Sequence, residues 1–391
     1  MVVMSRPAQG STNWFSAVDG NWATLQASVD QATCEGRLTL SSTLPVTTSD
    51  VTGATTLYYL PYKGNIVSLY NGTSWQGYTI PASGGSALSL SLSGLVANVT
   101  YDIYIYNNSG TLTLVATAWK SVTATNNPSS GSNVVINVSD TSGVSVGSLV
   151  TVAGGGNNEI AIVTAVSVNT SITVASLVNS YTTPTVYYPT RATALSVQNG
   201  IYVSGSNNAY RFLGLIRITS TAGQCEDSKV RRFVCNYYNR RQASLFTCPG
   251  YTNNNSINSF TTSSTSWVEA NGGTGSKVEL LSNGEDAVHY RGVADIFFNM
   301  TTSDPGGWVG VGENSPSSAT VEAGWQAYSG GVVNCHWNSS AARTVIQAEG
   351  YNYLDLLVVA YVVTITFYVE DARRGASADP YLTYLEATVM V

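Results

Sequence analysis

Three adjacent acidic pairs are the residues that most directly suggest hydrolytic chemistry in this sequence: Glu226-Asp227, Glu285-Asp286 and Glu370-Asp371. An enzyme that degrades polysaccharide needs two carboxylates facing each other across a glycosidic bond, about 5–10 Å apart. Neighbouring side chains of a strand point to opposite faces, so none of these pairs converges locally. We therefore expect structural or loop roles for them, and a hydrolase would need carboxylates that converge across the fold.

The two histidines, His289 and His336, are the other candidates for chemistry. Either could be the base of a Ser-His-Asp site, but no Gly-x-Ser-x-Gly sits at a strand-to-helix elbow. Neither histidine belongs to a His-x-His or His-Glu-x-x-His arrangement, the usual spacings of metal ligands. The sequence thus predicts a protein that is not an enzyme, with no catalytic residue, no metal ion and no cofactor.

A basic and aromatic segment follows the first acidic pair. Interleaved cations and aromatic rings can bind single-stranded nucleic acid, but a net charge of −6 with 17 basic residues disfavours that partner. As one continuous strand, the segment would mix charged and apolar side chains on both faces. That pattern favours contacts between subunits or domains, made by Glu226, Asp227, Arg231, Arg232, Tyr237, Tyr238 and Arg240.

Aromatic residues in loops offer a second type of binding surface. The chain has 24 tyrosines, most of which we expect in the core or in interfaces, where Tyr and Trp are common. The remainder could stack against sugars. The residues that we expect to face a host-surface glycan or protein are Trp75, Tyr78, Tyr251 and, in the polar loop Thr252–Ser266, Asn254 and Asn255.

The five cysteines contain no Cys-x-x-Cys pair and no spacing typical of zinc ligands. Buried thiols are one interpretation. A disulfide among Cys225, Cys235 and Cys248, or one between subunits, is the other, and an extracellular particle would permit it. The sequence leaves both interpretations open.

The elements that must position these residues are β-strands. Only 10% of the 391 residues are charged, against roughly 25% in ordinary soluble proteins, and Ser, Thr, Asn, Gly and Tyr replace them. These residues and Val favour strands and turns over helices. We predict an all-β fold of several β-sandwich or jelly-roll-like domains, with a short, partly helical N-terminal segment.

No signal peptide and no membrane insertion are expected. The start of the chain lacks a basic region followed by an apolar stretch. The longest apolar run, Leu354–Val369, is interrupted by threonines and is too short for a membrane helix. Its Val, Ile and Tyr content predicts buried strand, in two pieces.

Composition and turn signals divide the chain into four parts. Residues 1–40 contain a helical spacing over Asn13–Cys34 and are expected to attach the protein to a larger particle. Residues 41–119 form a β domain, in which Asn71-Gly72 predicts a type I′ hairpin turn. Residues 120–190, bounded by a Ser/Asn/Gly linker and by two Pro-Thr pairs, form a small inserted β-barrel or sandwich. Residues 191–391 form a jelly-roll-like C-terminal domain.

Three stretches carry a resemblance to a known family: Leu57–Asn65 running to Trp75, Leu112–Trp119 followed by Thr190–Leu195, and Tyr210–Arg217 leading into Asp227–Arg240. Together they resemble virion proteins of tailed bacteriophages and prophages, described as tail, fibre or spike proteins. In that pattern the tryptophan equivalent to Trp119 is followed almost at once by the Thr-Arg-Ala-Thr-Ala-Leu segment. The resemblance covers about 60% of the chain by length, and it supports an insertion at 120–189. The insertion itself resembles small β modules of phage tails and adhesins.

The resemblance implies a structural part of a virion, assembled in the host cytoplasm and extracellular on the mature particle. It implies no catalytic residues. Phage fibres are commonly trimers, so the resemblance implies a homotrimeric tail or collar appendage. We expect residues 1–40 to join it to other virion proteins. Host-surface binding is a further role that this interpretation allows. The alternatives are a capsid decoration or head-fibre protein, a polysaccharide-degrading tailspike, and a stand-alone carbohydrate-binding module.

Overall fold

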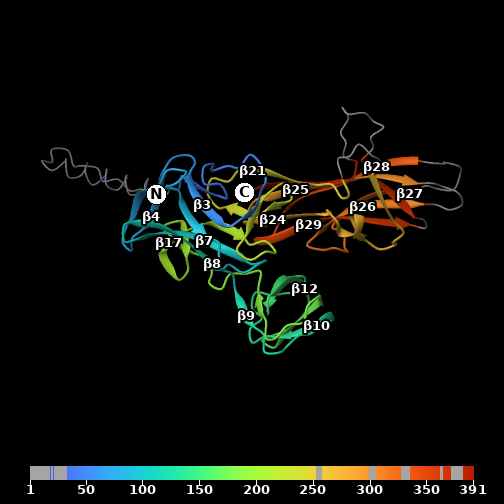
Figure 1. The fold of residues 1–391 in the computed structure, drawn as a ribbon, viewed down its shortest axis with the longest axis horizontal. Coiled ribbons are helices and arrows are strands. Elements are labelled where there is room, and N and C mark those ends of the chain that lie inside the picture. Colours follow the sequence, from blue (N-terminus) through green and yellow to red (C-terminus); the bar gives the residue numbers. More distant parts are fainter. Residues whose placement is uncertain are drawn as a thin grey trace, which may run out of the picture. The chain divides into compact units, whose positions relative to one another are not determined.

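The chain folds into two compact, all-β units. The computed structural model describes residues 33–251, 258–298, 305–326, 335–361, 364–370 and 382–391, together with Val18 and Asn21 (Figure 1). From Thr33 onward these residues form strands, with one short 3-10 helix, η1 (Ala270–Gly273), which confirms the predicted fold class. Unit 1 comprises Met1–Glu226 and Val234–Arg240, and unit 2 comprises Asp227–Phe233 and Arg241–Val391.

Unit 1 is built on a sheet in the order β15-β16-β17-β7-β8, in which β20 also pairs with β17. Its strands are β7 (Thr100–Asn108), β8 (Thr111–Ala118), β15 (Ser196–Gln198), β16 (Ile201–Ser204), β17 (Asn207–Arg217) and β20 (Val234–Asn236). Because β17 pairs with β7, residues 196–217 belong here, and a boundary at residue 191 is wrong. Asp102 and Tyr104 are buried, so β7 is covered on both of its faces over Thr100–Ile105.

A second sheet of unit 1 has the order β1-β3-β6, and β4 and β5 form a hairpin. The strands are β1 (Gly36–Thr39), β3 (Thr56–Pro61), β4 (Ile66–Tyr70), β5 (Trp75–Thr79) and β6 (Leu88–Ser91). All four residues of β1 are buried, so the expected attachment segment overlaps this sheet. In the range Asn13–Cys34, Val18 and Asn21 are helical, Cys34 forms a bridge with Val67, and most of the rest lies outside the described residues.

The β4–β5 hairpin is confirmed, but its turn differs from the prediction. A type I′ turn needs positive φ at both central residues. Gly72 has a φ of 101°, whereas Asn71 is absent from the positive-φ residues. Asn71 Oδ1 instead accepts hydrogen bonds from the N–H groups of Thr73 and Ser74, both at 2.9 Å. Tyr70 therefore pairs with Trp75 across a four-residue loop stabilised by an Asx turn.

Residues 121–187 form a six-stranded module within unit 1, in the order β10-β13-β12-β11-β14-β9. The strands are β9 (Ser121–Thr123), β10 (Gly131–Asn137), β11 (Leu149–Gly154), β12 (Asn157–Ser167), β13 (Ser171–Leu177) and β14 (Thr185–Tyr187). Buried valines and isoleucines fill its core, as expected. The two ends of the module meet, because Lys120 N–H donates to Thr190 O at 2.9 Å and Tyr188 N–H donates to Lys120 O at 2.8 Å.

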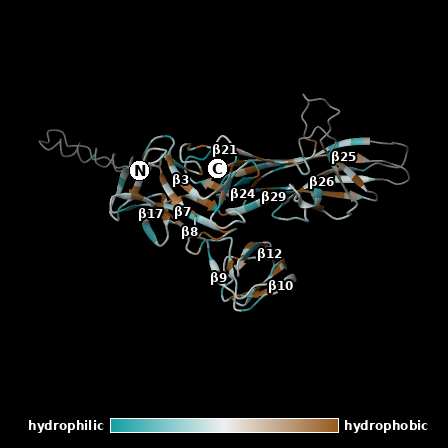
Figure 2. Cartoon of the chain, in the orientation of Figure 1, coloured by the Kyte–Doolittle hydropathy of each residue, from teal (hydrophilic) through white to brown (hydrophobic). Residues whose placement is uncertain are grey.

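Unit 2 is a sandwich of two sheets around one apolar core. One sheet contains β19 (Arg231–Arg232), β23 (Val268–Glu269), β24 (Lys277–Ser282), β26 (Gly306–Glu313), β27 (Val321–Gln326) and β29 (Gly350–Tyr361). The other contains β21 (Gln242–Thr247), β22 (Asn258–Thr262), β25 (Ala287–Phe298), β28 (Cys335–Ile346), β30 (Ile365–Glu370) and β31 (Tyr384–Met390). Polar and apolar residues lie side by side along these strands (Figure 2), as a two-sided sheet requires.

The apolar run Leu354–Val369 does form two strands, β29 and β30. Two short strands remain: β2 (Val51–Ala54) in unit 1 and β18 (Cys225–Asp227), where the chain leaves unit 1. Among the residues described, no helix has the length and hydropathy of a membrane span.

Candidate functional site

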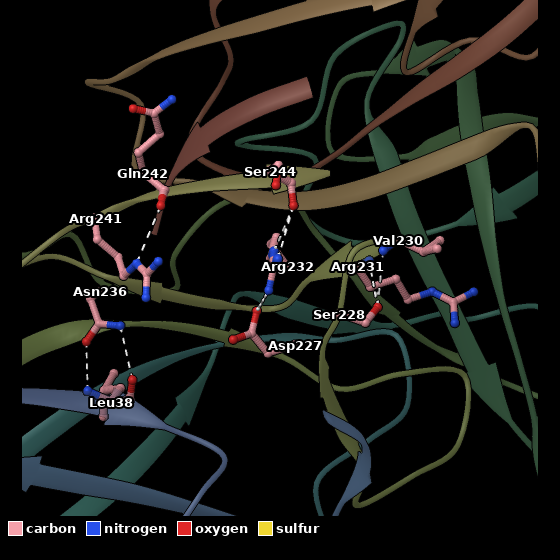
Figure 3. A network of polar contacts seen from close by, with 10 residues as sticks. All are labelled: Leu38, Asp227, Ser228, Val230, Arg231, Arg232, Asn236, Arg241, Gln242 and Ser244. Carbon is pink, nitrogen blue, oxygen red and sulfur yellow. Dashed lines mark hydrogen bonds and ion pairs between the residues drawn. The ribbon is translucent and has the colours of Figure 1, made fainter. Parts of the chain in front are cut away.

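The basic segment after Asp227 is not one strand. Residues 227–233 belong to unit 2 and residues 234–240 to unit 1, with β19 and β20 separated at Phe233. Phe233 to Asn236 are all buried, so the expected alternation of two mixed faces is wrong. The reason is tertiary: Asn236 Oδ1 accepts from Leu38 N–H at 2.7 Å, and its amide donates to Leu38 O at 3.2 Å (Figure 3).

The arginines of the part in unit 2 form ion pairs with carboxylates. Arg232 Nη1 lies 2.9 Å from Asp227 Oδ1 (Figure 3), and Arg231 Nε lies 2.5 Å from Glu279 Oε2. Arg232 also donates to the backbone carbonyl of Ser244 at 3.0 Å. Glu226 is 8% exposed. Arg231 and Arg232 are therefore paired with carboxylates of their own chain, and this stretch has a structural role in unit 2.

The aromatic part of the segment packs inside unit 1. The Tyr237 ring lies 5.2 Å from that of Tyr202 and 5.7 Å from that of Phe212, and the Arg240 guanidinium lies 5.5 Å from the Tyr237 ring. The Arg211 guanidinium lies 4.8 Å from the ring of Tyr238. These rings therefore pack against side chains of unit 1, whereas single-stranded nucleic acid needs aromatic rings that are open to its bases.

Arg211 centres a buried cluster that sequence reasoning missed. Its side chain is fully buried, and Nη1 donates at 2.8 Å to the carbonyls of both Thr33 and Ser68. Trp75 lies on this cluster, 5.6 Å from the guanidinium, and is only 7% exposed. Trp75 is therefore a core residue, and its expected place on a receptor-facing loop is wrong. Nothing in the local sequence distinguishes Arg211 from a surface arginine.

The other residues expected to face a receptor are scattered. Tyr78 is half-buried on β5, where its hydroxyl donates to Gln76 Oε1 at 3.2 Å and accepts from Asn107 at 3.1 Å. Tyr251 is half-buried beyond β21 in unit 2. Asn254 and Asn255 lie outside the described residues. Tyr78 therefore belongs to unit 1 and Tyr251 to unit 2.

A second buried cluster joins residues on either side of the six-stranded module. Asp102 is 3% exposed and accepts from Trp119 Nε1 at 3.0 Å and from Tyr104 Oη at 3.1 Å. Arg191 Nε donates to both Asp102 oxygens, at 3.0 and 2.9 Å, and the guanidinium lies 5.2 Å from the Trp119 ring. The buried carboxylate thus accepts hydrogen bonds from three side chains, and the cluster is structural.

The candidates for hydrolysis do not assemble a site within the described residues. His289 Nδ1 lies 2.6 Å from Thr344 Oγ1, and His336 Nδ1 lies 2.9 Å from the buried carboxylate of Asp295. Gly143–Gly147, which has Gly-x-Ser-x-Gly spacing, connects two strands without a helix. In the described ranges, no group of three or more His, Cys, Asp or Glu could hold a metal ion.

The described cysteines are thiols. Cys34, Cys225 and Cys235 are buried and Cys248 is half-buried. Cys34 Sγ lies 3.2 Å from the Tyr59 hydroxyl, and burial raises the pKa of the Cys34 thiol. The interpretation as buried thiols therefore holds for these residues.

Two carboxylates do converge in unit 2, around Lys277. Its ammonium contacts Glu269 Oε1 and lies 3.4 Å from Asp355 Oδ2. The Asp355 side chain has no exposed surface, and burial raises its pKa to about 7 against the opposing influence of Ser276 and Lys277. Burial also acts to raise the pKa of Glu269, but the hydrogen bonds with Lys277 and Asp355 and the charge of Lys277 together outweigh it, and that pKa is lowered. The three groups lie on neighbouring strands of one sheet, with Asp355 buried and Lys277 partly exposed.

The outer face of the sheet β21-β31-β25 is hollowed into a groove of about 390 Å³. A polar row crosses four strands, because Ser244 pairs with Thr388, Thr388 with His289, and His289 with Thr344. The next row places Phe246 opposite Glu386 and Glu386 opposite Arg291. Lys229 completes the polar lining of the groove. No sequence signal could find this site, because its residues come from four segments.

The groove contains two cations and one carboxylate. Arg291 Nε lies 2.8 Å from Glu386 Oε1, and its Nη2 donates to the Tyr384 hydroxyl at 2.6 Å. The rings of Tyr384 and Phe246 lie 5.6 Å apart. One carboxylate thus faces the two cations Lys229 and Arg291, beside hydroxyls and an apolar ring. This arrangement can bind a polar or anionic small molecule.

No family model matches the sequence, and no curated protein matches it. Among solved structures, the chain is similar to the structure of infectious bursal disease virus Gx strain, with 10% identity over 93% of this chain and 79% of that chain and a TM-score of 0.21. The structure of the Gt strain of this virus has 9% identity over 88% of this chain and 77% of that chain, with a TM-score of 0.18. SGBP-B, from a complex xyloglucan utilization locus in Bacteroides uniformis, has 9% identity over 88% of this chain and 99% of that chain, with a TM-score of 0.10. TM-scores this low define no common fold and assign no function.

Proposed function

We propose that this chain is a non-enzymatic structural component of a tailed-phage virion, a homotrimeric fibre or spike mounted as a tail or collar appendage. On this proposal, the protein assembles in the host cytoplasm and is extracellular on the mature particle, where its surface meets the host. Residues 1–40 would join it to other virion proteins.

The observation that supports this proposal most is the convergence of the three family-like stretches in unit 1. Arg191, from the Thr190–Leu195 stretch, packs on Trp119 of the second stretch and lies 5.4 Å from the ring of Phe212 in the third. Arg211, also in the third stretch, packs on Trp75 of the first. Residues that pack in one core constrain one another's side chains. The contacts between the three stretches therefore support reading the resemblance as that of one scaffold.

The alternatives differ in measurable ways. A capsid decoration protein would be a monomer in solution and trimerise or bind only on the particle. A polysaccharide-degrading tailspike would release reducing ends from host capsule. The contacts of His336 with Asp295 and of His289 with Thr344 favour the structural proposal over the enzyme, because both candidate bases already have a partner on a neighbouring strand.

Light scattering of the purified full chain, without reductant, tests the proposal. A stable species near three times 41.3 kDa supports the fibre or spike. A monomer contradicts the self-contained trimer and favours the decoration protein. Immunogold labelling of particles then locates the chain, and its absence from virions overturns the proposal. Release of reducing sugar from capsule would replace it with the tailspike.

A further inference from the structure

The groove on the outer face of β21, β31 and β25 has the features of a saccharide site. We propose that it binds a saccharide that carries a carboxylate, such as a uronic acid residue of a surface polysaccharide. The binding property depends only on the groove in unit 2. Its biological use, recognition of a host surface, rests on the proposed function.

The shape of the site supports a small ligand. Its volume of about 390 Å³ lies within the range of roughly 300–1,000 Å³ typical of small-molecule pockets. Strand pairing holds the lining residues of β21, β31 and β25 in register, so apart from Lys229 the site is built on strands rather than on loops. A site of this kind needs little reorganisation to bind.

The hydrogen-bonding groups match a sugar. Ser244 and His289 are exposed and Thr388 is half-buried, all on the same outer face. His289 uses Nδ1 toward Thr344, which leaves Nε2 directed away from that contact. Hydroxyls and an imidazole donate and accept, as the hydroxyl groups of a sugar do. Phe246 adds an apolar ring beside this polar row, against which the C–H face of a sugar can pack.

The charge of the lining selects a carboxylate over a neutral sugar. Glu386 is engaged by Arg291 Nε, and the guanidinium uses Nη2 toward Tyr384, so Nη1 remains for a ligand. Lys229 adds a second cation to the lining, and the Phe246 N–H bond to Lys229 O at 2.7 Å holds its loop beside β21. Charge-assisted hydrogen bonds are about twice as strong as neutral ones, so a carboxylate gains most here.

A titration with two matched sugars tests this proposal. Saturation-transfer NMR and chemical-shift titration of the full chain would compare methyl β-D-glucuronide with methyl β-D-glucoside. We expect the glucuronide to bind about tenfold or more tightly, because loss of one charged hydrogen bond costs about that factor. Absence of binding, or equal binding of the two sugars, would overturn the proposal.

Variants locate the site. Arg291→Gln should weaken glucuronide binding about tenfold. Arg343→Gln is the matched control, because Arg343 has similar exposure and pairs with Glu313 outside the groove. Ser244→Tyr, at an exposed position, should block the groove without breaking an ion pair and reports on the site even if R291Q is unstable. Equal affinity of R291Q, S244Y and R343Q would refute the assignment. Solution mass and particle labelling remain separate readouts, so failure here is distinguishable from failure of the virion proposal.

Discussion

The backbone amide of Lys120 bonds to the carbonyl of Thr190 although the whole six-stranded module lies between these residues in the chain. Directly beside this bond, Trp119 and Arg191 meet on the carboxylate of Asp102. Residues 119 and 191 are therefore neighbours in unit 1, and the chain enters and leaves the module at the same place in the scaffold. Thr151 and Asn158 of the module also form hydrogen bonds with Asn98 and Ala97.

Excision of the module tests this organisation. A chain in which a Gly-Gly linker replaces residues 121–189 should fold, because its new ends already lie within one hydrogen bond of each other. Residues 121–189 made alone should also fold, since their core is internal. Circular dichroism and thermal unfolding of both pieces check this. The hydrogen bond from Thr151 to Asn98 O at 2.7 Å is lost, so a small drop in Tm is expected. Insolubility of both pieces would show that module and scaffold depend on each other.

The Asp102 cluster should contribute strongly to the stability of unit 1. Arg191→Ala leaves a carboxylate that is 3% exposed without its cation, which typically costs about 3–5 kcal/mol. Glu386→Gln breaks an ion pair that is exposed at both ends and should cost less than about 1 kcal/mol. Denaturant unfolding measures both free energies. Similar costs for the two variants would mean that the buried pair adds no more than a surface pair.

The Asp355 carboxyl should make unit 2 less stable as the pH rises. Because burial raises its pKa to about 7 in the folded state, above the value near 4 of an unfolded chain, the folded state binds more protons between about pH 4 and 7. Its contribution is fully present below about pH 4 and is lost as the pH rises through 7, at up to about 1.4 kcal/mol per pH unit. Asp355→Asn removes this term. Denaturant unfolding at pH 5 and 7 should therefore show wild type losing stability relative to D355N, and parallel pH profiles would contradict the prediction.

Arg211 should tolerate even a conservative change poorly. A lysine lacks the planar guanidinium that packs against the rings of Trp75 and Tyr238 while its Nη1 donates to two carbonyls. We expect Arg211→Lys to destabilise unit 1 by about 2–4 kcal/mol, as loss of a buried network does. Arg241→Lys, at an exposed position, should lie within about 0.5 kcal/mol of wild type. Thermal unfolding compares them, and equal Tm values would exclude a central role for Arg211.

Local patterns predicted the elements better than they predicted the sites. Composition gave the all-β class, and Asn71-Gly72 and the run Leu354–Val369 gave a hairpin and two strands. Asn199-Gly200 joins β15 to β16 with a turn signal of the same kind. These features depend on residues close together in the chain.

The sites depend on partners far away in sequence. Asn236 bonds to Leu38, and this contact, not the local pattern, buries the middle of the basic segment. Trp75 is buried because Arg211 lies behind it, and no local rule places an arginine in a core. The groove requires Ser244, His289 and Glu386 to pair across three strands, a register that single-sequence reasoning cannot fix.

The interleaving of the two units along the chain has a consequence for the order of events on the ribosome. Residues 227–233 of unit 2 are synthesised before residues 234–240 of unit 1, so unit 1 lacks β20 until a part of unit 2 has already emerged. Unit 2 waits longer still, because β31 lies between β21 and β25 in the sheet and follows both of them in the chain. Until then β21 and β25 have unpaired edges, and nascent chains with such edges are prone to aggregate and need chaperone protection.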